Sequence, residues 1–174
     1  MSTLAPAGSN ESRLRLALLG LAALAISGTA IELATLRHWD TPVQMIPWFS
    51  LAAATVALGL VAYRPTPGKI RIARVIIALV VLTAIIGIYK HVDANYEAGP
   101  LDRVYGEKWD SMSSLSRWWA AVNGGVGPAP TLAAGVLAQA ALAIFFATVG
   151  HPALAQARSR ASESLRGSAA PVRR

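Results

Sequence analysis

Four long apolar stretches constrain the fold of this chain more than any other feature. They run over about Leu14–Leu36, Val43–Tyr63, Ile72–Tyr89 and Pro130–Val149. An α-helix rises about 1.5 Å per residue, so about 20 apolar residues cross the roughly 30 Å of a bilayer core. The sequence therefore predicts an all-α integral membrane protein, folded as a bundle of four transmembrane helices.

The composition agrees with a chain that lies mostly in lipid. Only 14% of its 174 residues are charged, whereas a soluble domain carries about 25%. We expect one membrane domain over residues 13–152, between a disordered tail (residues 1–12) and a basic tail (residues 153–174). The chain has no cysteine, which excludes disulfides, thiolate metal sites and covalently attached c-type haem.

Positive charge is concentrated on one side of the predicted bundle. Of the 16 lysines and arginines, eleven lie before or within the first turn of the first stretch, beyond the fourth, or between the second stretch and the first turn of the third. The other two connections carry five basic residues and six acids. Because Lys and Arg are retained in the cytoplasm, we expect both termini and the connection over 64–74 to be cytoplasmic, in a bacterial inner membrane. Charge spread over such short segments suits lipid headgroups and does not predict nucleic-acid binding.

Proline and glycine mark the helix boundaries. Thr41 and Pro42 predict the N-cap and first turn of the second helix. The third helix is expected to continue beyond the membrane as a polar turn or two, until Gly99 and Pro100 stop it.

A tryptophan-rich segment fills the long connection before the fourth stretch. Apolar side chains recur at helical spacing from Trp109 to Val122, including Trp118 and Trp119, which predicts an amphipathic helix on the outer membrane surface. Tryptophan is enriched at binding hot spots, so this helix is a candidate for docking a partner such as another membrane subunit. Simple lipid anchoring by the three tryptophans is the alternative.

Glu32 is the most informative single residue. It lies inside the first stretch, where a carboxylate is costly and must find a partner or take up a proton. The simplest partners would be Thr35, Gln44 or a backbone carbonyl left free by Pro47. A functional site is the other interpretation.

A second group of polar residues ends the third helix at the same outer face. The predicted polar cluster comprises Glu32, His38, Gln44, His91, Asp93, Asn95 and Glu97. A divalent metal could be held by His38, His91 and Glu97, since imidazole and carboxylate ligands suit Zn, Mn or Fe. Non-covalent haem between the two histidines is a further possibility. The competing interpretation is a solvated helix end with a Lys90–Asp93 surface pair.

Known catalytic signatures are missing from the sequence. It contains no phosphate-binding glycine-rich loop, no two-histidine zinc-protease motif and no serine-nucleophile motif. An enzyme is therefore the less favoured reading. The sequence predicts a non-enzymatic subunit or scaffold. The alternative is a metal- or haem-binding protein with a redox function.

Several short motifs are similar to those of a known group. They are Ile31-Glu32-Leu33, His38, Gln44-Met45-Ile46-Pro47-Trp48, the His91…Asn95…Glu97 spacing, and the proline-rich approach to the fourth stretch over 128–135. In these motifs the chain resembles small uncharacterised bacterial four-span integral membrane proteins. The resemblance implies a fold and no activity.

Overall fold

The computed structural model describes residues 7–168, and within that range every regular element is a helix. The all-α prediction is confirmed. The elements are α1 (Ala7–Thr35), α2 (Pro42–Ala62), α3 (Pro67–Ala98), η1 (Gly99–Leu101), η2 (Gly106–Ser111), α4 (Ser114–Val122), α5 (Ala133–Ala147) and α6 (Pro152–Ser168).

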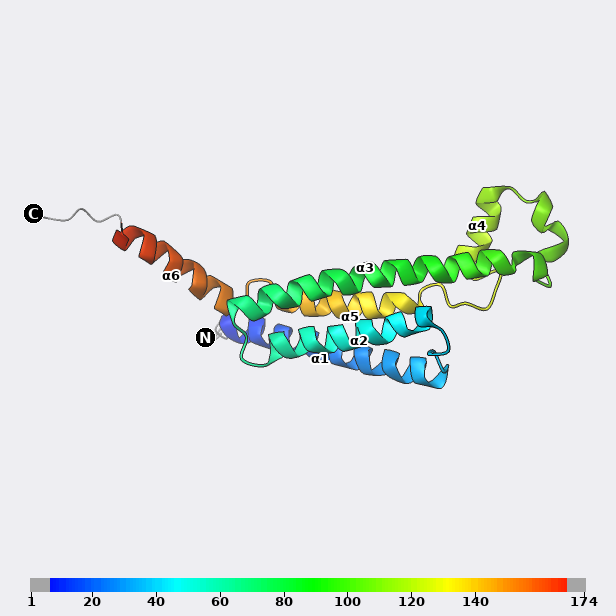
Figure 1. Cartoon of the computed structure of the whole chain (residues 1–174). Coiled ribbons are helices and arrows are strands. Elements are labelled where there is room, and N and C mark those ends of the chain that lie inside the picture. The colour runs from blue at the N-terminus through cyan, green and yellow to red at the C-terminus, as the bar shows by residue number, and fades with distance from the viewer. Residues whose placement is uncertain (1–6, 169–174) are drawn as a thin grey trace, which may run out of the picture.

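The helices α1, α2, α3 and α5 pack lengthwise against one another (Figure 1). α1 packs against α5 and α2, and α3 packs against the same two helices from the other side. Alanines dominate the contacts, and Ala22, Ala57, Ala73 and Ala141 are fully buried. Small side chains let helix backbones approach closely, which is how helices associate where no water drives them together. Many of the larger apolar side chains, such as Leu24, are exposed on the outside instead.

Three helices, α1, α2 and α3, are long and apolar enough to cross a membrane. The fourth predicted stretch is shorter than expected, because α5 has only 15 residues and spans about 22 Å. Pro128 and Pro130 precede it, and proline supplies no N–H to a helix. No side chain caps its start at Leu132. The turn after Thr148 ends it, with Gly150 in the left-handed region at φ 61°.

The two terminal segments each carry helix within the described range. α1 begins at Ala7, so the prediction of disorder is wrong for residues 7–12. Residues 1–6 and 169–174 lie outside the described range. At the other end, α6 extends away from the bundle, from the same end as the start of α1 (Figure 1).

The predicted helix boundaries around α2 and α3 are confirmed. The Thr41 side chain accepts from the Gln44 N–H, the Gln44 side chain accepts in return from the Thr41 N–H, and Pro42 opens the helix. This is a capping box, which satisfies two backbone donors that the first turn leaves free. α3 continues to Ala98 and is capped at Gly99.

The extension of α3 carries a small domain, which comprises residues 92–129. It is called the outer domain here because it lies beyond the end of α5 (Figure 1). Its core contains Val92, Trp109, Ala120, Ala121 and Val126. Tyr96 connects α3 to α4 and η2. Its ring stacks on that of Trp118 in α4, with 4.7 Å between ring centroids, and meets the edge of Trp109 in η2, with 5.4 Å between centroids. In Figure 1 this domain lies beyond the end of α5, with α4 running across the direction of α3.

Two arginines close the opposite end of the bundle. Arg15 Nε donates to the carbonyl of Ala147 at 2.8 Å, and Arg74 donates to the Thr148 hydroxyl at 2.9 Å and carbonyl at 3.1 Å. The last carbonyls of a helix have no partner within it and carry partial negative charge. α1 and α3 are thus both tied to the end of α5.

Candidate functional site

A cavity of about 370 Å³ opens between α1, α2, α3 and the start of α5, close to the outer domain. Its walls are mostly apolar and include Leu33, Leu36, Val43, Ile46, Ile86 and Leu137. The late start of α5 helps to leave this space, because residues 128–132 approach as an irregular segment and not as a helix. Pockets that bind small molecules have this size and this apolar character.

Four residues of the predicted polar cluster line this cavity. They are Glu32 from α1, His38 from the connection, Gln44 from α2 and His91 from α3. The other three members, Asp93, Asn95 and Glu97, do not line it. The structure thus brings four members of the predicted cluster to one cavity and leaves the three farther along α3 outside it.

The Gln44 side chain is held by the backbone of the connection between α1 and α2. Its Oε1 accepts from the backbone N–H groups of Asp40 at 2.8 Å and Thr41 at 3.0 Å. Both interactions use the oxygen, so the Nε2 amide group is left to donate toward the cavity.

The two histidines differ in their environments. His91 Nδ1 lies 2.8 Å from the carbonyl oxygen of Pro130. A carbonyl only accepts, so Nδ1 carries the hydrogen and Nε2 of a neutral ring is a free acceptor. Partial burial lowers the pKa of His38 from its usual value, and the nearby charge of His91 lowers it further. His38 is therefore neutral at pH 7.

Glu32 has none of the simple partners that its position suggested. The Thr35 hydroxyl donates to the Ile31 carbonyl at 2.8 Å, and Gln44 Oε1 is used in the cap. Within the described residues, no hydrogen bond or ion pair engages the Glu32 carboxylate. The predicted bond to Thr35 or Gln44 is wrong. Glu32 is exposed and not enclosed in the bundle interior, and its free carboxylate lies at the cavity wall.

The polar residues farther along α3 have structural roles. Lys90 and Asp93 form an exposed pair at 3.1 Å, which confirms the solvated alternative for that position. Asn95 is fully buried and bonds to the main chain of Ala129 and Ala121. Glu97 is exposed. Its position, six residues beyond His91, puts it about 9 Å farther along the helix.

No metal site of the predicted kind is assembled. Among residues 7–168, there is no group of three or more His, Asp or Glu side chains that could hold a metal ion. The prediction of a site from His38, His91 and Glu97 is therefore wrong. Glu97 lies too far along α3 and on a different face from His91.

The three tryptophans have separate environments. Trp109 is only 3% exposed and Trp118 is partly buried against Tyr96, whereas Trp119 is 66% exposed. A role of Trp109 in partner or lipid contact is thus wrong. The predicted continuous amphipathic segment is also divided, into η2 and α4.

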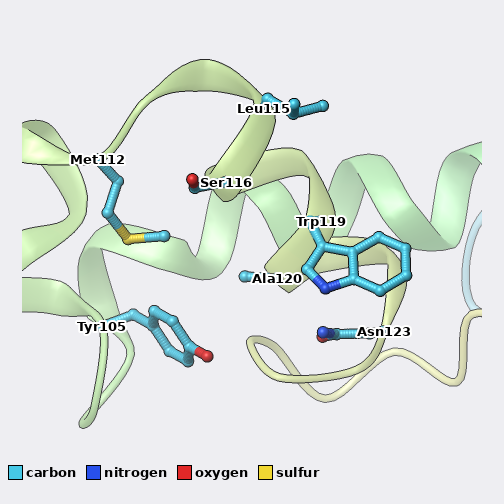
Figure 2. Close-up of a pocket in the computed structure, with 7 residues that line it drawn as sticks. All are labelled: Tyr105, Met112, Leu115, Ser116, Trp119, Ala120 and Asn123. Atoms are coloured by element: carbon cyan, nitrogen blue, oxygen red, sulfur yellow. The ribbon is translucent and has the colours of Figure 1, made fainter.

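A second, shallower pocket of about 390 Å³ lies on the outer domain (Figure 2). Trp119 and Leu115 from α4 border it, together with Tyr105 and Met112 from the preceding connection. Leu115 is 81% exposed. This apolar face has no covering segment within the described part of the chain.

Comparison with known proteins gives no match to a family model, to a curated protein or to a solved structure.

Proposed function

We propose that this protein is a four-span protein of a bacterial inner membrane, with both termini in the cytoplasm and the outer domain on the opposite face. The long apolar α1, α2 and α3 support this proposal, as does the concentration of basic residues at the end of the bundle where α1 begins. α5 completes the fourth crossing together with residues 128–132. Irregular backbone is tolerated at membrane depth where protein covers it, and Asn95 and His91 bond to this segment.

The function that fits this architecture is a non-enzymatic membrane subunit. In our proposal, the outer domain docks the extracytoplasmic part of another membrane protein. One observation carries this: the exposed side chains of Leu115 and Trp119 border a concave apolar pocket on a domain with its own aromatic core. A hollow of this kind accepts an inserted side chain, as binding hot spots do. A helix that only anchors in lipid needs no hollow.

A pull-down in mild detergent tests the docking proposal. Trp119→Ala combined with Leu115→Ser removes the exposed face and leaves the Tyr96–Trp118 stack intact. Loss of two anchor contacts should weaken capture of the partner at least about tenfold. Leu101→Ser is the matched control, because Leu101 is 89% exposed but lies outside the pocket. Unchanged capture by the double variant would contradict docking through α4.

A further inference from the structure

The interhelical cavity contains a buried hydroxyl that has no partner. Thr29 lies on α1 at 8% exposure and lines the cavity, and its Oγ1 makes no hydrogen bond within the described structure. A buried hydroxyl without a partner destabilises the fold, because it has lost its hydrogen bonds to water. Thr35, on the same helix, avoids this cost by donating to a carbonyl one turn back. The Thr29 hydroxyl is thus available to something that enters the cavity.

Other free groups at the cavity include both donors and acceptors. Thr29 and Glu32 are three residues apart and share one face of α1. Glu32 offers a carboxylate acceptor and His91 offers Nε2, while Gln44 offers its Nε2 amide as a donor. A ligand that satisfies them must both donate and accept hydrogen bonds.

The charges at the cavity argue against an anionic headgroup. Lys90 is the one cation among the lining residues when the histidines are neutral, and it is paired with Asp93. Glu32 would repel a phosphate or carboxylate. A single carboxylate among mostly apolar walls would also replace little of the hydration shell of a strongly charged cation. The site therefore suits a compact, uncharged polar head.

The cavity also offers a route for an apolar tail. Several of its lining residues are exposed on the outside of the bundle, among them Leu36 at 61% and Val43 at 60%. In the membrane placement proposed above, this outer surface meets lipid. A bound molecule could keep its head among the polar groups and leave its chain in the bilayer.

We propose that this cavity binds an isoprenoid quinol, with the ring between α1, α2 and α3. A quinol has hydroxyls at opposite ends of its ring, which can donate to Glu32 and His91. The same oxygens can accept from Thr29 and Gln44. Membranes supply such molecules with the apolar tail that the opening accommodates. The proposal concerns binding, and it depends on the membrane placement but not on partner docking.

Calorimetric titration with decyl-ubiquinol tests the proposal. The full chain is placed in phosphatidylcholine nanodiscs, and the heat absorbed or released by protein-free nanodiscs is subtracted. Wild-type protein should bind the probe at a single site. Removal of one hydrogen bond by Thr29→Val should weaken binding about tenfold, and Glu32→Gln should weaken it as well. Thr29→Ser restores the hydroxyl and should restore the affinity.

Thr35→Val is the matched control, since it removes a hydroxyl from the same helix outside the cavity. Binding that is equal in wild type, Thr29→Val and Glu32→Gln would overturn the proposal, as would no binding beyond that of empty nanodiscs. Occupation of the cavity by a phospholipid acyl chain, detected by native mass spectrometry as lipid that decyl-ubiquinol does not displace, would also overturn it. Single-cysteine labelling in intact spheroplasts tests the membrane placement separately.

Discussion

Asn95 bonds to both main-chain polar groups of Ala129. Its Nδ2 donates to the Ala129 carbonyl at 2.8 Å, and its Oδ1 accepts from the Ala129 N–H at 2.8 Å. A third bond runs from Nδ2 to the carbonyl of Ala121 at 3.3 Å. One buried side chain on α3 thereby fixes both the end of α4 and the segment that leads into α5, which forms one wall of the cavity.

Replacing Asn95 with alanine should destabilise the protein strongly. The change removes the partner of two partly buried backbone groups of Ala129 and of the buried Ala121 carbonyl, and an unsatisfied buried group costs about 1–3 kcal/mol. The thermal midpoint in mild detergent should therefore fall by several degrees. Asp93→Ala serves as the control, because an exposed ion pair contributes about 0–1 kcal/mol. Equal midpoints for the two variants would refute the structural role of Asn95.

Gly124 and Gly127 share a backbone conformation that favours glycine, but only Gly127 also has a close neighbour. Both have positive φ, 74° and 75°, where a side chain costs about 1–2 kcal/mol. A Cβ at Gly127 would also collide with Asn95, whereas one at Gly124 would meet nothing within 4 Å. Gly127→Ala should lower the thermal midpoint clearly more than Gly124→Ala. If the two losses are the same, the close approach of Asn95 is not important.

Arg74 should contribute more to the stability of the protein than Arg71 does. Arg74→Gln removes donors to the Thr148 hydroxyl and carbonyl, and hydrogen bonds from charged groups contribute about 1.5–3 kcal/mol. Arg71 is exposed, so Arg71→Gln should change the stability little. Unfolding of both variants in detergent, followed by circular dichroism, gives the comparison, and a greater loss for Arg71→Gln would speak against the cap on α5.

Stability should decrease as the pH falls below about 6.5. Burial lowers the pKa of His38 and of His151, with added effects from His91 and Arg15 respectively, from the usual value of 6.5. A pKa that is lower in the folded state means that the unfolded chain binds protons first. The stabilisation from the two neutral histidines is thus complete above pH 6.5. It is lost as the pH falls through the pKa values that His38 and His151 have in the folded protein.

Thermal midpoints at pH 7.5 and 5.5 measure this dependence. His38→Asn with His151→Asn should reduce the difference between the two values, and asparagine at 151 keeps a side-chain acceptor for the Ala153 N–H. An undiminished difference in the double variant would assign the pH dependence to other groups.

Local signals in the sequence were sufficient for most of the helical framework. Apolar runs, the Thr41–Pro42 start and the Gly99–Pro100 stop act within a few residues of the features they determine. The grouping of Glu32, His38 and His91 could be predicted from the order of the helices alone, since alternating helix directions place all three at one end of the bundle. Such short-range arguments do not need the tertiary packing.

Features that depend on contacts between distant segments could not be predicted. Asn95 was interpreted as a member of a site because nothing in the sequence indicates Ala129 as its partner, 34 residues away. Trp109, Trp118 and Trp119 look alike in sequence, and only Tyr96 separates the buried rings from the exposed one. The short α5 depends on how residues 128–132 bond to α3.

Single-cysteine labelling tests the central claim, that the bundle crosses the membrane with the outer domain outside. The chain has no cysteine of its own, so Ser114→Cys on exposed α4 and Gly68→Cys, where an added Cβ meets nothing within 4 Å, each give one reporter. Gly99 is unsuitable, because a side chain there would collide with Trp109. In intact spheroplasts, an impermeant maleimide should label Ser114→Cys at once and Gly68→Cys only after permeabilisation. Labelling of Gly68→Cys but not Ser114→Cys in intact spheroplasts would contradict the orientation, and equal labelling of both would contradict the crossing itself.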